Sequence, residues 1–401
     1  MKKQILNNEW DNIFFKYGEK YVLSNHAFPL YLFTVRLYNE LKENNTKDIL
    51  FMSREGQFLK KLFDRYCELR KEAGLDVIDI KTHYFYGSRN STMAASLKPL
   101  EEENFELLFR FFKVMSAEDF MHSIGFSQNQ IQEVVKDMTL NTKIKHPDFA
   151  ISLPFLELKK NETFKKIYEE NRVSEGKAFG LYMKSFGIDY EKDGLVFVDI
   201  GYHGTMQDLI NKFFDSKINI KGYFVKSRCF EEEKEYKIGL LSDKFNTKYE
   251  GEDINSYDAY NYEQILRADH GRCLGYRING DLAEPVIDTE LDDKEVFEKY
   301  VSEMQNQIFD KFELIAKKCL KENLEATNIC ILYYYETIRR KSSYDYSWII
   351  DMQNTSHDDF GIVGYFGKLF SRHSRWYSFK LKDRKFVKLH KRYIKELCSK
   401  I

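Results

Sequence analysis

Two segments of this chain have the same order of features: a short apolar run, a loop that contains glycine, and an amphipathic helix. The first segment runs from Asp48 to Tyr66 and the second from Leu195 to Phe214. A unit of this kind directs backbone N–H groups and the positive end of the helix dipole to its loop, where they can hold an anion. Two such loops in one sheet predict an α/β fold that binds a ligand with two phosphate groups.

Four apolar runs predict strands, and two amphipathic segments that follow them predict helices. The strands are expected at 49–53, 76–86, 195–199 and 218–228, and the helices at 57–72 and 206–214. Because strands and helices alternate at this spacing, the connections should be right-handed crossovers within a mainly parallel sheet. Ligands of such sheets bind beyond the carboxyl ends of the strands.

The remaining segments are predicted to be helices, loops and one hairpin. A helix is expected over 21–42, with Pro29 in its first turn or at a kink, and the charged, Tyr-rich stretch 230–260 should form loops. The stretch 271–281 resembles a hairpin that turns at Asn279-Gly280, and 292–344 has a helical pattern.

These patterns predict two regions. An α/β catalytic region with Rossmann-like strand–loop–helix units is expected over 1–290, with a helical insertion at about 95–190. A helical C-terminal region over 291–401 should end in a basic amphipathic tail. The tail, residues 372–401, contains 11 Lys or Arg residues and only two acids. It is expected either to lie on an anionic membrane surface or to pack on the domain as a basic helix.

Composition excludes several classes of protein. The net charge of −1 over 401 residues argues against a nucleic-acid partner, although binding of RNA by the basic tail is a third alternative for that segment. The six cysteines lie far apart, which argues against a zinc site and a disulfide framework. Scattered reduced thiols fit the cytoplasm, and no apolar run approaches the ~18 residues of a membrane span. We therefore expect a cytoplasmic protein, at most peripheral at the inner face of the membrane.

Candidate phosphate ligands follow the first two predicted strands. The loop Ser53-Arg-Glu-Gly56 offers the Ser53 hydroxyl, the Arg54 guanidinium and helix amides that begin at Gly56. Ser88 and Arg89 repeat this theme after the next strand. Arginine suits a diphosphate because its fork makes parallel hydrogen bonds with a charge that does not titrate. A polar turn, or an arginine paired with a nearby acid, would give the same short pattern.

The loop from Asp199 to Thr205 is the strongest local signal. Asp199 could orient a sugar hydroxyl, hold a magnesium ion or accept a proton. Gly201 and Gly204 let the backbone approach a phosphate, and the Thr205 hydroxyl and the helix amides complete the cradle. His203 is a surface residue, a phosphate donor or a proton shuttle.

Three further residues are weaker candidates. Glu263 and His270 could serve in acid/base catalysis or in binding an acceptor, with a solvated helix face as the alternative for Glu263. Lys226, at the end of a predicted strand, could neutralise a phosphate.

Five stretches, in this order along the chain, resemble one protein family. They are Tyr21–Phe33, Phe51–Leu59, Tyr84–Arg89, Val198–Gln207 and Glu263–Tyr276. The chain resembles the glycan phosphoribosyltransferase domain of bacterial polysaccharide ribofuranosyltransferases. The resemblance implies that 5-phosphoribosyl 1-diphosphate donates ribofuranose 5-phosphate to a sugar of a growing, lipid-linked glycan such as capsule or O-antigen.

The resemblance also implies roles for the candidate residues. The diphosphate would be held by Arg54, Arg89 and the helix that begins at Gly56, and the 5-phosphate by the loop from Gly201 to Thr205. The wider donor-phosphate set consists of Ser53, Arg54, Gly56, Ser88, Arg89, Gly201, Gly204, Thr205, Gln207 and Lys226. Asp199 or Glu55 would accept the acceptor proton or hold Mg²⁺, with His203 as a third catalytic candidate.

Members of this family often carry a fused phosphatase of the haloacid-dehalogenase type. That phosphatase needs an Asp-x-Asp-x-Thr type motif after a strand, and Asp76-Val-Ile-Asp79 has the wrong spacing. A separate phosphatase should therefore act on the product. Three alternatives remain: a sugar phosphatase of that type, a nonenzymatic membrane-associated scaffold of polysaccharide assembly, and a glycosyltransferase that uses a nucleotide-sugar.

Overall fold

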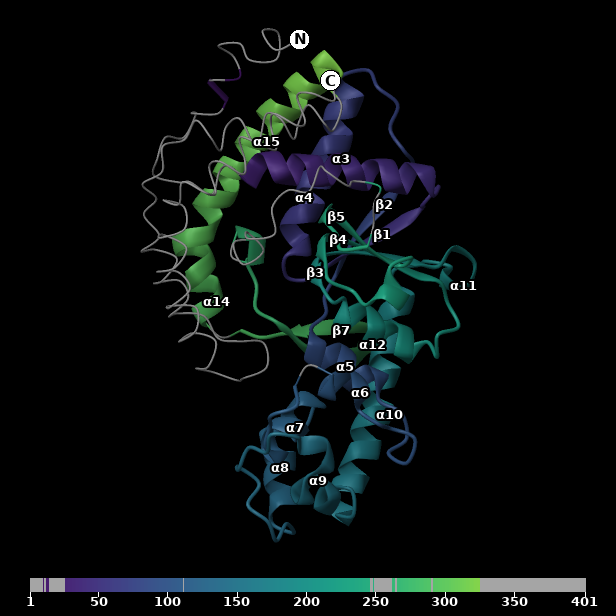
Figure 1. Ribbon diagram of the computed structural model, residues 1–401, viewed down its shortest axis with the longest axis vertical. Coiled ribbons are helices and arrows are strands. Elements are labelled where there is room, and N and C mark those ends of the chain that lie inside the picture. Colours follow the sequence, from purple (N-terminus) through teal and green to yellow (C-terminus); the bar gives the residue numbers. More distant parts are fainter. Residues whose placement is uncertain are drawn as a thin grey trace.

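A parallel β-sheet forms the centre of the molecule (Figure 1). The computed structural model describes residues 10, 12–13, 26–110, 112–245, 248, 262–263, 265–289 and 291–324. The sheet has five strands in the order β2-β1-β3-β4-β5, and all pairings are parallel. Its strands are β1 (Asp48–Met52), β2 (Lys81–Phe85), β3 (Leu195–Tyr202), β4 (Ile220–Ser227) and β5 (Lys237–Ser242). The predicted α/β fold with a mainly parallel sheet is confirmed.

The strand order contains one reversal of direction. From β1 the chain moves outward to β2, and it then returns to place β3 on the other side of β1 and continues to β4 and β5. The connections that follow β1 and β3 therefore run in opposite directions along the sheet, which makes the carboxyl edge between them a topological switch point. Doubly wound sheets of this order bind their ligands at that switch point.

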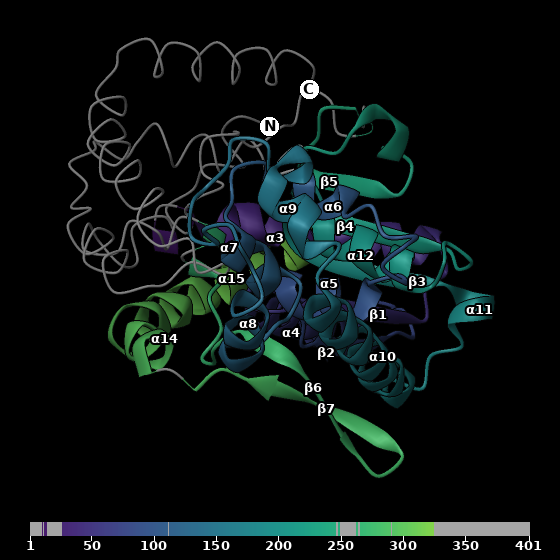
Figure 2. The same cartoon turned by 90° about the horizontal axis from the view of Figure 1, so that it is seen from below.

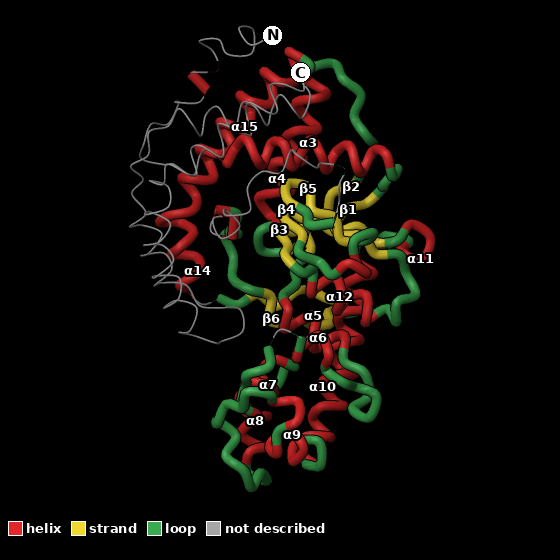
Figure 3. Tube along the Cα trace, in the orientation of Figure 1, coloured by secondary structure: helices red, strands yellow, loops and turns green. Residues whose placement is uncertain are grey.

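Both faces of the sheet are covered by helices, so its strands are apolar on both sides. In β1, Ile49 and Phe51 belong to one core, while Leu50 and Met52 belong to another. The first core is completed by α3 (Ala27–Glu43), α4 (Gly56–Glu72) and α15 (Ser302–Glu322), and the second by α10 (Glu162–Ser185) and α12 (Thr205–Phe213). Figure 3 shows the strands enclosed by these helices.

Between β2 and β3 the chain forms a series of helices, as expected for this stretch. Besides α10 they are α5 (Arg89–Ser96), α6 (Glu106–Phe109), α7 (Ala117–Ser123), α8 (Gln128–Val135), η2 (Phe149–Ile151), α9 (Leu153–Leu158) and α11 (Tyr190–Asp193). Helices α7, α8 and α9 form a lobe beside the sheet (Figure 1). Its core combines aliphatic residues with several aromatic ones, of which Phe105, Phe120 and Tyr168 are at most 1% exposed. Ser116 and Ser127 cap α7 and α8 through their hydroxyls, which is why these short helices begin there.

The hairpin predicted at 271–281 is present, but its second strand extends beyond the predicted range, to Ile287. It consists of β6 (Cys273–Asn279) and β7 (Leu282–Ile287), and Gly280 has a φ of +63° in the turn. The hairpin packs on α10 and its tip projects from the body of the molecule (Figure 2). It is a separate two-stranded sheet and does not extend the main sheet. The segment before it, 265–272, can therefore lie near the carboxyl edge of the main sheet.

The predicted secondary structure was wrong in two places. The strand expected at 76–86 begins only at Lys81, because the preceding main chain is held by side chains: the Asp76 carbonyl accepts hydrogen bonds from Tyr38 and Arg70. The stretch expected to form loops at 230–260 contains η3 (Glu231–Glu233) and β5. The apolar run in β5 is short and lies among charged residues, so its period gave little signal.

After the hairpin the chain is helical as far as it is described. The elements are α14 (Leu291–Val296), the π-helical turn η4 (Phe297–Val301) and α15. The tail at 372–401 and most of the expected helix beyond 324 lie outside the described residues. The division into regions at 290 stays a prediction.

Candidate functional site

The candidate site lies at the switch point between β1 and β3. The loop Ser53–Gly56 follows β1 directly, and β3 ends within the loop that runs from Gly201 to Thr205. Since β1 and β3 pair in parallel, both loops emerge at the same edge. The structure thus brings together the two loops that the sequence singled out.

The loop after β1 is held tightly against its surroundings. The buried Ser53 hydroxyl donates a hydrogen bond to the Gly87 carbonyl over 2.6 Å and accepts one from the Gly87 N–H over 2.8 Å. Gly56 lies so close to β1 that a Cβ atom there would be 2.7 Å from the Phe51 carbonyl carbon. The main-chain N–H of Arg54 donates to the Glu55 carboxylate over 3.1 Å. Ser53 therefore joins the ends of β1 and β2, and Arg54 and Glu55 are the polar side chains that this loop carries at the edge of the sheet.

Asp199 is the buried centre of the site. Only 7% of this residue is exposed, and its Oδ1 accepts a hydrogen bond from the Ile200 N–H over 2.7 Å. Burial, together with the negative charges of Glu55 and Glu263, raises the pKa of the Asp199 carboxyl to about 8, while the hydrogen bond from the Ile200 N–H and the charge of Arg89 oppose the rise. Four predicted residues from four segments of the chain therefore lie within electrostatic reach of one another. A buried carboxyl with such neighbours is typical of a functional site.

A tyrosine and a histidine extend the site toward β2. The Tyr84 hydroxyl lies 2.7 Å from His270 Nε2, and His270 Nδ1 lies 2.7 Å from the Gly271 carbonyl oxygen. Because a carbonyl only accepts, Nδ1 carries the proton and Nε2 accepts from Tyr84 in the neutral ring. Burial, followed by the charge of Glu55, raises the pKa of Tyr84, so this hydroxyl stays protonated. Of this pair the sequence singled out only His270.

The segment that carries His270 is anchored to the start of α4. Gln57 Nε2 donates to the Asp269 carboxylate over 2.8 Å, and the Asp269 N–H donates back to the Gln57 side chain over 3.4 Å. This pairing spans more than two hundred residues of sequence, so only the folded chain shows it. It places His270 beside the loop after β1.

The loop after β3 requires glycine at two positions. Gly201 has a φ of +118°, and a Cβ atom there would lie 1.9 Å from the Lys226 carbonyl oxygen on β4. Gly204 has a φ of +68° and precedes α12, whose first residue is Thr205. A Cβ atom at Gly204 would lie 3.0 Å from the Phe224 ring and 3.1 Å from the Lys237 side chain, so the glycine makes room for protein atoms, and it is the N-terminus of α12 that favours an anion.

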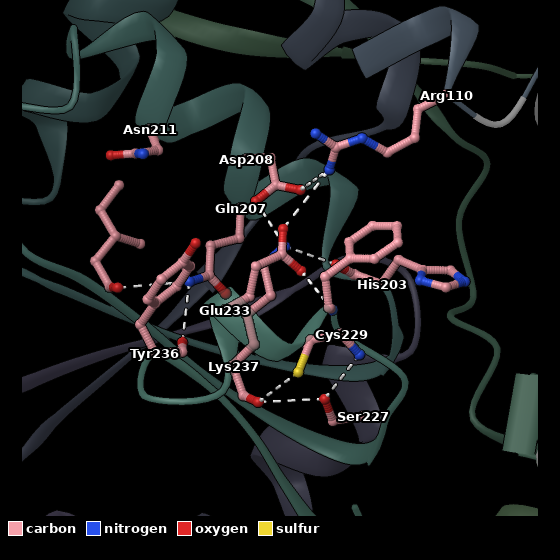
Figure 4. Close-up of polar contacts among 12 residues, drawn as sticks. Arg110, His203, Gln207, Asp208, Asn211, Ser227, Cys229, Glu233, Tyr236 and Lys237 are labelled. Carbon is pink, nitrogen blue, oxygen red and sulfur yellow. Dashed lines mark hydrogen bonds and ion pairs between the residues drawn. The ribbon is translucent and has the colours of Figure 1, made fainter. Parts of the chain in front are cut away.

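A buried ion network lies beneath this loop (Figure 4). Lys237 Nζ, on a side chain only 1% exposed, lies 2.6 Å from Asp208 Oδ1 and 3.0 Å from Glu233 Oε1. It also donates a hydrogen bond to the His203 carbonyl over 2.8 Å, while Arg110 lies 3.6 Å from Glu233. Lys237 therefore fixes the main chain of the loop from below.

The network also affects the pKa values of Asp208 and His203. Burial raises the pKa of Asp208 to about 6, and the Lys237 ammonium limits that rise. Burial and the same ammonium lower the pKa of His203, so its imidazole is neutral at neutral pH. Of the network residues only His203 was predicted. Lys237 was missed because it lies on β5, which the sequence did not reveal. The run Lys237-Ile-Gly-Leu-Leu241 was the signal available.

Three predicted phosphate ligands lie beside the two loops but are buried or bonded to the framework. Ser88 caps α5, with its Oγ accepting from the Ser91 N–H over 3.0 Å and donating to the Cys273 carbonyl over 2.7 Å. Gln207 is 2% exposed, and its amide donates to the Tyr236 carbonyl over 3.1 Å. Lys226 is 7% exposed at the end of β4. Ser88 and Gln207 hold the framework together, and we leave them out of the proposed site.

The described residues show neither a metal-binding cluster nor a membrane-spanning helix. Within the described part of the chain, no group of three or more His, Cys, Asp or Glu side chains is placed to hold a metal ion. Among the same residues, no helix combines the length and the apolar character that crossing a bilayer needs. Comparison of the sequence with known proteins finds no family model that matches and no curated protein that matches.

The Asp199 carboxyl should make stability depend on pH. Its pKa is raised in the folded chain, so between about pH 4 and pH 8 the unfolded carboxyl is ionised while the folded one is protonated. The free energy of unfolding should therefore fall as the pH rises through this window, by up to about 1.4 kcal/mol per unit. Urea denaturation of wild type and Asp199→Asn across this range measures the effect. The difference between the two proteins should change with pH, and a constant difference would contradict the raised pKa.

Gly201→Ala should disrupt the loop after β3. The positive φ costs about 1–3 kcal/mol for a residue with a side chain, and the added methyl group would also meet the Lys226 carbonyl. Gly74→Ala is a matched control, because Gly74 has a φ of +72° but no atom near its Cβ position. Thermal or urea unfolding should show a larger loss of stability for Gly201→Ala than for Gly74→Ala. Equal losses would mean that the close approach of Gly201 to β4 does not affect the free energy of unfolding.

Lys237→Met should destabilise the protein strongly. Removing the ammonium leaves Asp208 and Glu233 buried without their main cation, which costs about 3–5 kcal/mol in comparable buried pairs. Lys234→Met is the control, since Lys234 is exposed and lies 4.0 Å from Glu231. Its effect should stay within about 0.5 kcal/mol. Urea denaturation would refute the role of Lys237 if the two variants proved equally stable.

Proposed function

We propose that this chain is a glycosyltransferase that transfers ribofuranose 5-phosphate from 5-phosphoribosyl 1-diphosphate to a sugar of a growing surface polysaccharide, such as capsule or O-antigen. The observation that carries the proposal is the cluster at the switch point. There the buried Asp199 lies within electrostatic reach of Glu55, Arg89 and Glu263, between two loops suited to anions. The resemblance of five sequence stretches to ribofuranosyltransferases supplies the donor and the acceptor class.

In the proposed reaction, an acceptor hydroxyl oxygen forms a bond to the anomeric carbon of the donor. The bond from that carbon to the diphosphate oxygen breaks, and diphosphate leaves with the electron pair. Arg54 and Arg89 would bind this leaving group, because guanidinium groups pair with phosphate oxygens through two hydrogen bonds. The transition state is cation-like at the anomeric carbon, so stabilising the departing charge would supply most of the rate.

The 5-phosphate of the donor would bind at the loop from Gly201 to Thr205. This loop leads into the N-terminus of α12, where the helix dipole favours an anion. The neutral His203 would offer a hydrogen bond or pass a proton rather than add a charge. Lys237 would act as a positioning residue, since it touches the loop only through the His203 carbonyl.

The proton of the acceptor hydroxyl would pass to Asp199 or Glu55. A general base works best when its pKa lies near the working pH, and the pKa of Asp199 is raised to about 8, so the proton would be accepted by the ionised fraction of Asp199, which is the smaller fraction at neutral pH. Glu263 and His270 remain candidates for contacts to the acceptor sugar. Tyr84 would orient His270 through the hydrogen bond between them.

The residues present also fit a magnesium ion bound together with the donor. Mg²⁺ is usually held by one or two carboxylates plus substrate phosphates, and Asp199 and Glu55 would supply the carboxylates. When bound, the ion would neutralise charge on the diphosphate.

The proposal carries expectations about partners. The acceptor would be lipid-linked, so we place the reaction in the cytoplasm at the inner face of the membrane, with residues 372–401 as a candidate contact to anionic lipid. A separate phosphatase would remove the 5-phosphate from the transferred ribofuranose. No nucleic acid is expected as a partner.

Calorimetry with 5-phosphoribosyl 1-diphosphate, with and without Mg²⁺, tests the donor. Wild type should bind it, and Arg54→Ala should bind at least about tenfold more weakly, since a charge-assisted contact is worth 1.5–3 kcal/mol. Turnover by Arg54→Ala, measured as diphosphate release, should fall about 10²–10³-fold. Arg277→Ala, an exposed arginine on β6, is the control and should behave as wild type. A folded wild-type protein that does not bind the donor, with or without Mg²⁺, would overturn the proposal.

A further inference from the structure

A cavity of about 430 Å³ opens beyond the carboxyl ends of β4 and β5. It is lined by Lys226, Ser227, Arg228, Cys229, Phe230, Ser242, Asp243 and Lys244. Its volume lies within the range of small-molecule sites. Nothing in the proposed mechanism uses this cavity, apart from Lys226 as a candidate phosphate ligand.

The cavity adjoins the loop after β3. In the sheet register Gly201 pairs with Lys226 and Tyr202 with Ser227. The Arg228 N–H donates to the Tyr202 carbonyl over 2.8 Å, and the Arg228 guanidinium lies 5.5 Å from the centre of the Tyr202 ring. Reacting atoms in an enzyme complex must come within about 3–3.5 Å of each other. The acceptor oxygen must therefore reach the anomeric carbon, which would lie between the loop proposed for the 5-phosphate and the arginines proposed for the diphosphate. The cavity borders the first of these.

The lining of the cavity is positively charged. Lys226, Arg228 and Lys244 are cations, and Asp243 is the single acid among the lining residues. The Asp243 carboxylate accepts hydrogen bonds from the N–H groups of Gly239 and Phe245, over 2.6 and 2.8 Å. It therefore shapes the turn that carries Lys244, and the balance of charge favours an anionic ligand.

The remaining lining residues suit a sugar. Ser242 supplies a hydroxyl group, whereas the Ser227 hydroxyl already donates to the Lys237 carbonyl over 3.2 Å and accepts from the Cys229 N–H over 3.3 Å. Phe230 is an aromatic side chain with 39% of its surface exposed. Lys226 and Ser227 are 7% and 2% exposed, so polar atoms lie at the floor of the cavity, while Arg228 and Lys244 are exposed at its mouth. Buried polar atoms at the floor with charged side chains at the rim allow both orientation and charge recognition.

We propose that this cavity is the acceptor subsite and binds a sugar unit that carries a carboxylate or a phosphate. The assignment of the cavity to the acceptor rests on the proposed function. The binding of an anionic sugar rests on the cavity alone. Arg228 and Lys244 would pair with the anion, and the floor would contact the ring.

The test uses three probes: glucuronate, glucose 1-phosphate and glucose. Saturation-transfer NMR should detect at least one of the two charged sugars on wild type, and the one detected shows whether the site prefers carboxylate or phosphate. Glucose should bind at least about tenfold more weakly, the factor that corresponds to loss of one charge-assisted contact. Binding of glucose equal to that of the charged sugars would overturn the proposal.

Variants assign the binding to the cavity. The double variant Arg228→Gln with Lys244→Gln should weaken binding of the charged sugar at least about tenfold. A matched control, Arg277→Gln with Lys177→Gln, removes the same charges from exposed positions on β6 and α10 and should leave binding unchanged. Unchanged binding by the first double variant would refute the assignment.

A measurement of donor binding distinguishes a failure of this proposal from a failure of the proposed function. The double variant Arg228→Gln with Lys244→Gln should bind 5-phosphoribosyl 1-diphosphate within about twofold of wild type, since neither side chain is assigned to the donor and the Arg228 N–H that bonds to the Tyr202 carbonyl is retained. Loss of donor binding in this variant, or displacement of the charged sugar by the donor, would overturn a separate subsite. If wild type binds the charged sugar through Arg228 and Lys244 but does not bind the donor, the proposed function fails and the anionic-sugar site stands.

Discussion

The parallel pairing of β1 with β3 determines the position of every group in the candidate site. Leu50 pairs with Phe197 and Phe51 with Val198, so the two strands end at one edge. The chain leaves that edge toward opposite sides of the sheet, to β2 from β1 and to β4 from β3. Asp199 lies at this switch point because it is two residues beyond Phe197 on β3.

The two buried acidic clusters at this edge differ in how their charge is balanced. Asp208 and Glu233 share the Lys237 ammonium, and their network holds the loop after β3 from beneath. Asp199 has two carboxylates among its electrostatic neighbours, and burial raises its pKa further. A carboxyl kept protonated at neutral pH destabilises the fold when it ionises, a cost that proteins accept mainly at functional sites. The first cluster is structural and the second is the better candidate for chemistry.

Elements outside the sheet complete the site from a distance. Ser88 joins the start of α5 to β6, and Gln57 joins α4 to Asp269, just before the hairpin. These contacts bring His270 to Tyr84 at the end of β2. Loss of the hairpin contacts would therefore affect the site although β6 and β7 pair only with each other.

The sequence by itself determined the α/β class, the two strand–loop–helix units and the loops that carry Arg54, Asp199 and Gly201. These features are local: apolar period, glycine and helix pattern are properties of neighbouring residues. Tertiary structure alone decided that both loops meet at one switch point and that Ser88 and Gln207 bond to the framework. It alone placed Lys237 under the loop and Tyr84 against His270. Such pairings join residues far apart in sequence, and burial, which sets the pKa of Asp199, exists only once the layers have packed.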